Sequence, residues 1–265
     1  MGAHRLTQAR RRFAAMLALG GTLAAGLAAG LAAGMAAANG GEAAAGPADT
    51  QTLLLFSGAD VTPSGWFAHS GARFSPFSPI TRSGPLLAVF AGGGGYRYAG
   101  PAGAKVNGTF ATGEAMAGYQ IVTPKLGAAL LGGVRRERHR LDLPDPGNPV
   151  QGARTGFAAA FDAWAKPADG ILVTLAGNAT TVFGGYYLRA SAGHALPLGE
   201  DLFAGIEGVV LGNRQFRQYR IGGQISGYRV GAAQMGVSAG WLGDDGRSGR
   251  RGDGFYAAAS LWHRR

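Results

Sequence analysis

Apolar and polar residues alternate along most of the chain, and the alternation is clearest between Asp201 and Gly231. One face of a first strand there carries Leu202, Ala204, Ile206, Gly208 and Val210, and one face of a second carries Tyr219, Ile221, Gly223 and Ile225. The opposite faces carry Glu207, Arg220, Gln224 and Ser226. A period of two residues indicates β-strands whose two faces meet different environments.

Similar alternation predicts twelve strands between residues 51 and 263. They lie near 51–62, 66–76, 85–99, 108–122, 126–140, 150–165, 171–179, 182–195, 201–212, 216–229, 232–242 and 253–263. Strands of about ten residues cross a bilayer when tilted, and aliphatic residues opposite charged ones suit a wall between lipid and a polar lumen. No segment after residue 38 shows apolar residues repeating with the 3.6-residue period of a helix. We therefore predict an all-β fold, a single antiparallel up-and-down transmembrane β-barrel of about 12 strands.

The lengths of the predicted connections support this topology. An even number of strands places both chain ends on one side, so even-numbered connections should be short turns and odd-numbered ones should face outward. The predicted even-numbered turns are Ser78–Ser83, Thr123–Lys125, Lys166–Gly170, Leu196–Glu200 and Arg229–Gly231. The two longest charged connections, 141–152 and 243–254, are both odd-numbered.

The first 38 residues have the pattern of a cleavable signal peptide. Four arginines lie within residues 1–12, residues 13–38 carry no charge, and the run ends in Ala36-Ala37-Ala38. This order of regions is typical of secretory signals. A retained transmembrane helix is the alternative, but the segment is mostly Ala and Gly. The predicted organisation is a signal peptide over 1–38, a flexible lead-in over 39–50 and an outer-membrane barrel over 51–265.

Composition narrows the chemistry. The chain has 48 Gly and no Cys, which excludes disulfides, thiolate zinc sites and a cysteine nucleophile. The formal charge of +10 falls to +6 without residues 1–38, which hold four Arg and no acid. The remaining basic clusters, 135–140 and 247–251, are expected to be basic loops that face anionic lipopolysaccharide or acidic polysaccharide. Export argues against a nucleic-acid partner.

The polar members of the alternation are candidate lumen residues. Asp60, Glu114, Asp162, Arg189, Glu207 and Arg220 are predicted to form a paired ionic core. The residues predicted to face lipid are Leu53, Leu55, Ile171, Val173, Leu175, Ile221, Phe255 and Leu261. Aromatic residues near strand ends are predicted to form interfacial girdles: Trp66, Tyr96, Tyr98, Tyr119, Trp164, Tyr186, Tyr187, Trp241 and Trp262.

Catalytic motifs are weak in this chain. The Gly92–Gly95 run has no following Gly-Lys-Ser/Thr, so it does not indicate a phosphate loop. His139 is close in sequence to Asp142, but no serine is evidently paired with it. Histidines and acids do not cluster at metal-ligand spacing. We expect no catalytic residues, no metal and no cofactor.

Several short stretches, in order, resemble the alphaproteobacterial cellulose biosynthesis protein BcsS family. They are Phe56-Ser-Gly-Ala-Asp-Val61, Gly93-Gly-Gly-Tyr-Arg-Tyr98, Asp145-Pro-Gly-Asn148, Leu188-Arg-Ala190 with Gly193, Gly205-Ile-Glu207, Arg217-Gln-Tyr-Arg220 with Gly222 and Gly227, Ser238-Ala-Gly240 and Asp245-Gly-Arg-Ser-Gly249. The resemblance spans nearly the whole mature chain. It implies a secreted barrel-like protein associated with bacterial cellulose production, and it supplies no catalytic residues.

The resulting expectation is a non-enzymatic outer-membrane barrel that supports cellulose biosynthesis or export. Its partners would be outer-membrane lipid and lipopolysaccharide, and cellulose or the cellulose synthase and export machinery. Candidate glycan contacts near the outer loops are Tyr96, Arg97, Tyr98, Asp145 and Asn148, with turn and girdle chemistry as the alternative role. Two other functions stay open: a general outer-membrane channel or structural porin-like barrel, and an envelope lipid-modifying enzyme.

Overall fold

The structure, a computed structural model, describes residues 50–265 apart from 199–200 and 246–252. The predicted signal peptide and residues 39–49 of the lead-in lie outside the described residues. The strands are β1 (Leu53–Thr62), β2 (Gly65–Phe74), β3 (Gly84–Ala99), β4 (Lys105–Val122), β5 (Leu126–Leu141), β6 (Gly152–Ala165), β7 (Ile171–Thr180), β8 (Tyr186–Ala195), β9 (Phe203–Gly212), β10 (Arg217–Val230), β11 (Ala233–Asp244) and β12 (Gly254–Arg264). A short 3-10 turn, η2 (Pro101–Gly103), joins β3 to β4.

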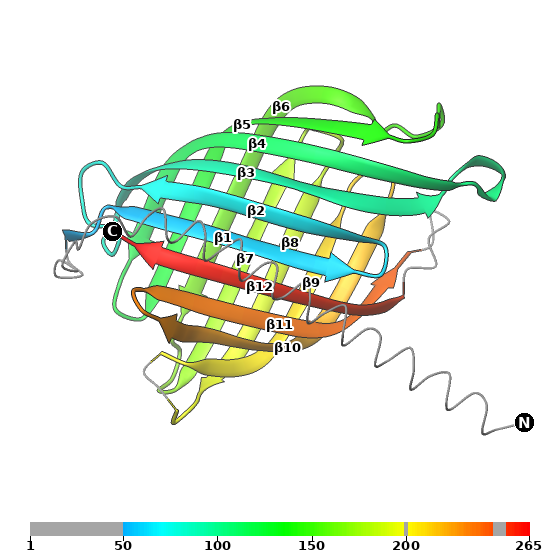
Figure 1. The fold of residues 1–265 in the computed structure, drawn as a ribbon. Coiled ribbons are helices and arrows are strands. Elements are labelled where there is room, and N and C mark those ends of the chain that lie inside the picture. The colour runs from blue at the N-terminus through cyan, green and yellow to red at the C-terminus, as the bar shows by residue number, and fades with distance from the viewer. Residues whose placement is uncertain (1–49, 199–200, 246–252) are drawn as a thin grey trace, which may run out of the picture. The chain divides into compact units, whose positions relative to one another are not determined.

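The twelve strands close into an antiparallel barrel in sequence order. Each strand pairs with its neighbours in the chain, and β1 pairs with β12 to complete the ring. Figure 1 shows this seam as the blue strand beside the red one. The predicted all-β up-and-down barrel is confirmed. None of the described segments forms a helix with the length and apolar character needed to cross a membrane.

The two ends of the barrel differ. At the end of the barrel here called the terminal end, the first and last strands lie together, and the Leu53 backbone N–H donates to the Arg265 carbonyl at 2.9 Å. The even-numbered connections lie at this end as well. The loop end holds the odd-numbered connections. The turn expected at Ser78–Ser83 is longer than predicted, because β2 ends at Phe74 and β3 begins at Gly84. Ile80, within this connection, is buried. Gln120 holds this connection by donating its amide to the Ile80 carbonyl at 3.0 Å.

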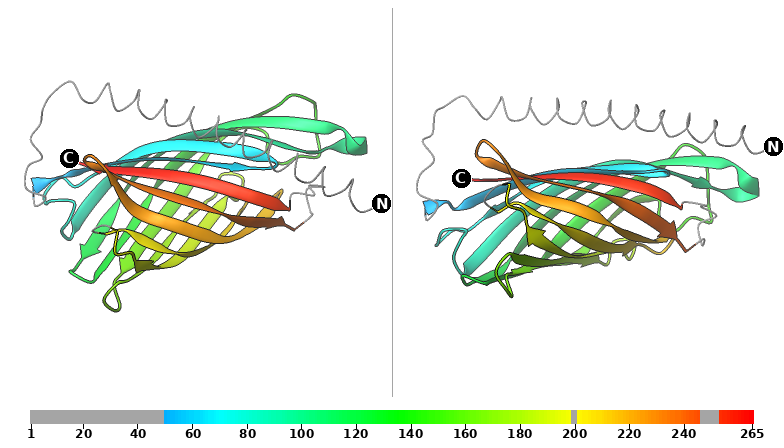
Figure 2. Two further views of the ribbon diagram at one scale, coloured as in Figure 1. Left: turned by 60° about the horizontal axis from the view of Figure 1, so that its bottom comes forward. Right: turned by 90° about the horizontal axis from the view of Figure 1, so that it is seen from below.

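The strands around β4 extend furthest at the loop end. β3, β4 and β5 have 16, 18 and 16 residues, and the β3–β4 hairpin projects beyond its neighbours (Figures 1 and 2). The basic run 135–140 lies on β5, as the predicted strand 126–140 has it, and not in a basic loop. Alternation turns Glu137 and His139 to the buried face and Arg136, Arg138 and Arg140 to the exposed one. The second basic cluster, 247–251, lies outside the described residues.

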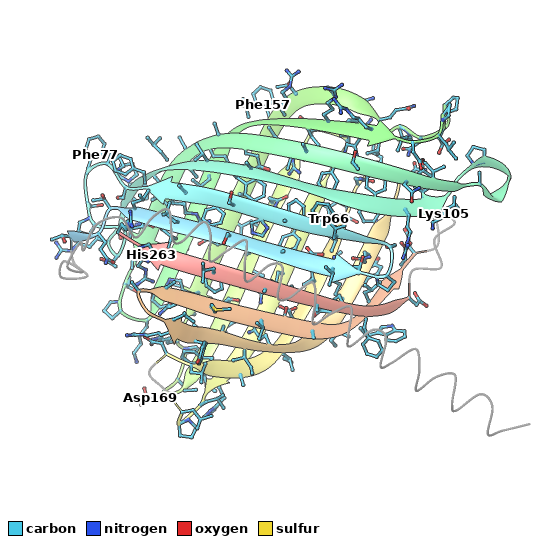
Figure 3. All side chains as sticks on the ribbon, in the orientation of Figure 1. Trp66, Phe77, Lys105, Phe157, Asp169 and His263 are labelled. Atoms are coloured by element: carbon cyan, nitrogen blue, oxygen red, sulfur yellow. The ribbon has the colours of Figure 1, made fainter. Side chains whose placement is uncertain are left out.

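The outer face of the barrel is largely apolar. Ile206 and Ile221 are each 68% exposed, and Phe157, on the outer side in Figure 3, is 75% exposed. Val173, Leu175 and Phe255 are also exposed, as predicted for lipid-facing positions. Trp66, Tyr119 and Trp241 are exposed as well, which fits interfacial aromatics.

The girdle prediction is wrong for the aromatic residues that face inward. Tyr96, Tyr98 and Tyr187 line the interior of the barrel rather than its outer rim. Trp164 and Trp262 share the inward face of their strands with Asp162 and Tyr256. The prediction used nearness to a strand end, whereas the face of a side chain depends on its parity along the strand.

Inward glycines make room for aromatic rings from neighbouring strands. A Cβ on Gly92 would lie 2.8 Å from Cε2 and Cζ of Phe67, and one on Gly94 would lie 2.7 Å from Cε1 of Phe110. Gly94 and Phe110 are direct partners in the β3–β4 register. Each ring therefore lies across a glycine on the wall of the barrel. Glycine within a strand often marks such close approach.

Replacing one of these glycines should strain the barrel. In Gly92→Val the new methyl groups would overlap the Phe67 ring, which packs against His69, Phe90 and Phe110 and has little freedom to move. We expect a loss of about 1–3 kcal/mol in the free energy of unfolding, measured by urea denaturation in detergent.

Gly132→Val is the matched control, because a Cβ on this β5 residue has no neighbour within 4 Å. Equal destabilisation by Gly92→Val and Gly132→Val would contradict the steric explanation.

Candidate functional site

The interior of the barrel contains a cavity of about 510 Å³ that reaches the loop end. Its lining includes Ser64 of the β1–β2 turn, Gly65 at the start of β2, and Asn213 and Gln215 of the β9–β10 turn. It extends inward to Met116 and Leu131 on β4 and β5. A volume between about 300 and 1,000 Å³ is typical of sites for small ligands.

One side of the cavity is a continuous layer of aromatic rings, here called the aromatic wall. Its members are Phe56, Phe67, His69, Phe90, Tyr96, Tyr98, Phe110 and His139, from β1 to β5. The Phe67 and Phe110 ring centroids lie 5.6 Å apart with planes 11° from parallel. Phe110 and His139 lie 5.4 Å apart at 14°. Such contacts add stability beyond the burial of ring area.

The other side is polar and is here called the polar wall. It consists of Asp60, Asn178, Tyr187, Gln218 and Arg220. An Arg220 guanidinium nitrogen lies 3.1 Å from a carboxylate oxygen of Asp60, and Arg220 Nε donates to the Gln218 side-chain oxygen at 2.8 Å. β1 and β12 are neighbours, so this pair spans the seam region from β1 to β10.

A second ionic cluster lies on β8 to β12, closer to the terminal end. Arg189 Nε donates to Glu207 at 2.6 Å, and another Arg189 nitrogen donates to Gln224 at 2.7 Å. The Tyr256 hydroxyl donates to the second Glu207 oxygen at 2.7 Å. Glu207 is only 3% exposed, so its charge depends on these donors.

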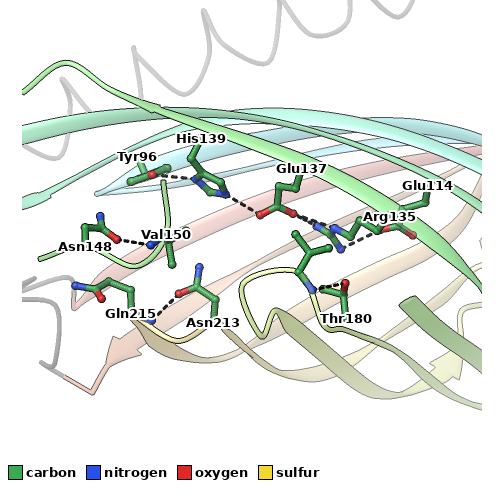
Figure 4. Close-up of polar contacts among 11 residues, drawn as sticks. Tyr96, Glu114, Arg135, Glu137, His139, Asn148, Val150, Thr180, Asn213 and Gln215 are labelled. Carbon is green, nitrogen blue, oxygen red and sulfur yellow. Dashed lines mark hydrogen bonds and ion pairs between the residues drawn. The ribbon is translucent and has the colours of Figure 1, made fainter. Parts of the chain in front are cut away.

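A third network runs along β3, β4 and β5 beside the aromatic wall (Figure 4). The Tyr96 hydroxyl lies 2.9 Å from His139 Nδ1, and His139 Nε2 lies 2.6 Å from Glu137. Glu137 accepts from Arg135, which also pairs with Glu114 at 2.9 Å. Both carboxylates thus share one arginine.

Towards the terminal end the cavity lining passes into apolar packing. Ala88, Met116 and Leu131 line the cavity and pack with a buried cluster that includes Ile80 and Leu86. Arg73 and Asp162 form an ion pair at this level, joining β2 to β6. The Arg73 guanidinium also lies over the Phe56 ring, 6.0 Å from its centroid.

At the loop end, the connection between β5 and β6 folds back onto β3. The Tyr98 hydroxyl donates to Asp145 at 2.7 Å and accepts from the Asn148 amide at 2.8 Å. Asp145 and Asn148 are 7% and 3% exposed, so the two side chains anchor the connection. At its start, the Asn107 side-chain amide and backbone N–H donate to Asp142 and hold the pKa of that carboxyl below its usual value.

The predicted ionic residues lie where the alternation placed them. All six belong to ion pairs: Asp60, Glu114, Asp162, Arg189, Glu207 and Arg220. Among the predicted glycan contacts, Tyr98, Asp145 and Asn148 bond to one another, and Tyr96 is near them through ring contact with Tyr98. Arg97 is separate, since its guanidinium donates to the Pro63 carbonyl at 2.6 Å.

Sequence reasoning missed two sets of residues. Arg73, Arg135 and Glu137 complete the ion pairs, and the inward phenylalanines form most of the aromatic wall. Parity was the available signal, because Arg135, Glu137 and His139 occupy alternate positions on β5. Treating 135–140 as one basic cluster hid that alternation.

The histidines outside the N-terminal segment have the following partners. His139 contacts Tyr96 and Glu137, while His194 and His263 contact backbone carbonyls. Within residues 50–265, gaps aside, these histidine contacts include no serine, and no group of three or more His, Asp or Glu could hold a metal ion.

The Arg189–Glu207 pair generates a stability prediction. Glu207→Gln keeps the side-chain shape but removes the buried charge opposite half-buried Arg189, and we expect a loss of about 3–5 kcal/mol. Urea denaturation in detergent measures this change. Adding Arg189→Gln to Glu207→Gln should recover part of the loss.

Asp201→Asn is the matched control, because Asp201 pairs with Arg229 and Lys166 at exposed positions. Its expected cost is below about 1 kcal/mol. A Glu207→Gln cost as small as that of Asp201→Asn would contradict the assigned role of the cluster.

Comparison with solved structures returns bacterial β-barrels at low sequence identity. The translocator domain of autotransporter NalP from Neisseria meningitidis is 9% identical, with 92% of this chain and 98% of that chain covered and a TM-score of 0.49. KdgM porin is 9% identical, with 79% and 98% covered and a TM-score of 0.43. LpxR from Salmonella typhimurium is 14% identical, with 80% and 99% covered and a TM-score of 0.44.

No curated protein matches the chain. The sequence family described as cellulose biosynthesis protein BcsS matches residues 54–265. This range begins in β1 and ends at the last residue, so it includes all twelve strands. The expected family resemblance is confirmed: the chain belongs to the cellulose biosynthesis protein BcsS family.

Proposed function

We propose that the protein is a non-enzymatic outer-membrane barrel that supports the export or surface handling of cellulose. The observation that carries this proposal is the family match over the barrel itself, from Leu54 to Arg265. The chain is thus a barrel associated with cellulose biosynthesis, and its contribution would come from the barrel and its loops. The cellulose synthase and export machinery are the proposed partners.

The outer face of the barrel supports a membrane location. Large apolar side chains such as Leu130, Phe157, Ile206 and Ile221 are exposed on strands whose opposite faces carry paired charges. Exposed apolar surface of this extent is costly in water, but it suits contact with acyl chains. Together with the predicted signal peptide, this surface supports the outer membrane as the site of action.

The interior supports a binding or structural role over a general channel. Ion pairs link residues across the lumen, and Met116 and Leu131 connect the cavity lining to buried apolar packing. Narrow barrels filled with side chains of this kind leave little room for bulk water. The channel alternative is therefore the less favoured of the two.

Deleting the gene in a cellulose-producing strain should lower the cellulose at the cell surface. The measurement is binding of a cellulose-specific dye per cell, with an intact copy of the gene restoring the signal. Cellulose synthase abundance, measured in the same cells, is the control for an indirect effect on the synthase. Unchanged surface cellulose in the deletion strain would count against the proposal.

A charge on the outer face should impair the protein in the membrane. Ile221 lies well within β10 and is 68% exposed, so Ile221→Arg should cost about 2–4 kcal/mol if lipid covers it. Tyr219→Arg, two residues nearer the loop end and beside native Arg217, is the control and should cost about 0–1 kcal/mol. Unfolding in lipid vesicles measures both, and equal costs would argue against burial of this face in a bilayer.

A further inference from the structure

We propose that the cavity binds a short segment of uncharged β-glucan, with sugar ring faces on the aromatic wall and hydroxyl edges on the polar wall. The choice of β-glucan rests on the proposed function. The chemistry of the ligand, a neutral molecule with apolar faces and polar edges, rests on the cavity itself.

The aromatic rings pack closely against glycine positions on the wall of the barrel. Phe67 and Phe110 lie across Gly92 and Gly94, with their planes 11° apart, and Phe110 continues to His139 at 14°. At centroid separations of 5.6 and 5.4 Å the rings are stacked with an offset, so each ring covers part of its neighbour and leaves the rest of its surface open to the lumen. A β-linked glucan is a flat ribbon whose C–H groups point above and below the sugar rings, so its faces match this surface.

The polar groups of the cavity suit the hydroxyl edges of such a ribbon. Asn178, Tyr187 and Gln218 place amide and phenol groups on the polar wall.

The balance of charge favours a neutral ligand over an acidic sugar. Each carboxylate that lines the cavity already pairs with an arginine: Asp60 with Arg220, Glu114 and Glu137 with Arg135, and Asp162 with Arg73. These four carboxylates share three arginines, so the pairs leave no positive charge in excess for an acidic sugar. A fatty acyl chain, in turn, would leave the polar wall desolvated without hydrogen bonds.

The available space limits the ligand to a short segment. The inward residues Ala160 and Ala176 on β6 and β7 are small, and they leave the space between the two walls. The cavity of about 510 Å³ is reached from the loop end, where Ser64 and Gln215 line it. A chain end or a short oligosaccharide fits this volume.

The test is isothermal titration of the purified full chain in detergent with cellohexaose. Maltohexaose tests the β-linkage, hexagalacturonate tests for an acidic sugar, and a fatty acid tests for an acyl chain. We expect saturable binding of cellohexaose and weaker or no binding of the other three. Absent cellohexaose binding, or tighter binding of any of the other probes, would overturn the inference.

Phe67→Leu tests the aromatic wall, because leucine keeps an apolar side chain but removes the flat ring. We expect about tenfold weaker cellohexaose binding, the scale of a single aromatic contact. Phe157→Leu, on the outer face, is the control and should bind as the unaltered protein does. Resistance of the folded barrel to SDS at room temperature checks folding of both variants.

Unchanged binding in folded Phe67→Leu would overturn the role of the aromatic wall. The two proposals fail separately. Reduced cellulose in the deletion strain without cellohexaose binding would refute the cavity inference alone, and binding with normal cellulose in the deletion strain would refute the proposed function.

Discussion

The structure depends on the need to pair every backbone amide within the chain. Lipid offers no hydrogen bonds, so a sheet that faces acyl chains has to close on itself. The ladder from β1 to β12 meets this requirement, with β1 and β12 paired along eight residue positions from Leu54 to Val61. Once the wall is closed, each side chain points either to lipid or to the lumen, and the two-residue period of the sequence follows.

The many glycines have a specific role inside this wall. Where an aromatic ring points inward, its neighbour across the ladder is often glycine, as for Phe110 with Gly94 and Tyr96 with Gly108. The missing side chains let the rings pack against the wall, where they line one half of the cavity. Glycine thus lowers the intrinsic stability of the strands but leaves the space that the inward rings occupy.

Much of the fold followed from alternation alone. Twelve strands, their order and the inward position of residues such as Glu207 and Arg220 all depend on local periodicity, which a sequence displays directly. The partners of these residues were not predictable, because they depend on the tilt and stagger of the closed barrel. Arg220 and Asp60, for example, are 160 residues apart in the chain.

The candidate site was harder to predict for the same reason. Tyr96 and Tyr98 were correctly singled out, but their place near a strand end suggested the rim, whereas their parity puts them inside with Phe90. Phe56, Phe67 and Phe110 come from three strands, and only the register brings their rings together. Contacts between strands therefore had to come from the structure.

The seam also sets the order of events in assembly. Eleven of the twelve strand pairings join consecutive segments, so they need only short loops to close. The remaining pairing joins the first strand to the last. It closes a loop that contains almost the entire domain, so it has the largest entropic cost of loop closure. Until β12 (residues 254–264) pairs with β1, the sheet has two unpaired edge strands that can pair with other chains. Pairing of β12 with β1 therefore ends the stage of assembly in which this protein is most prone to aggregate.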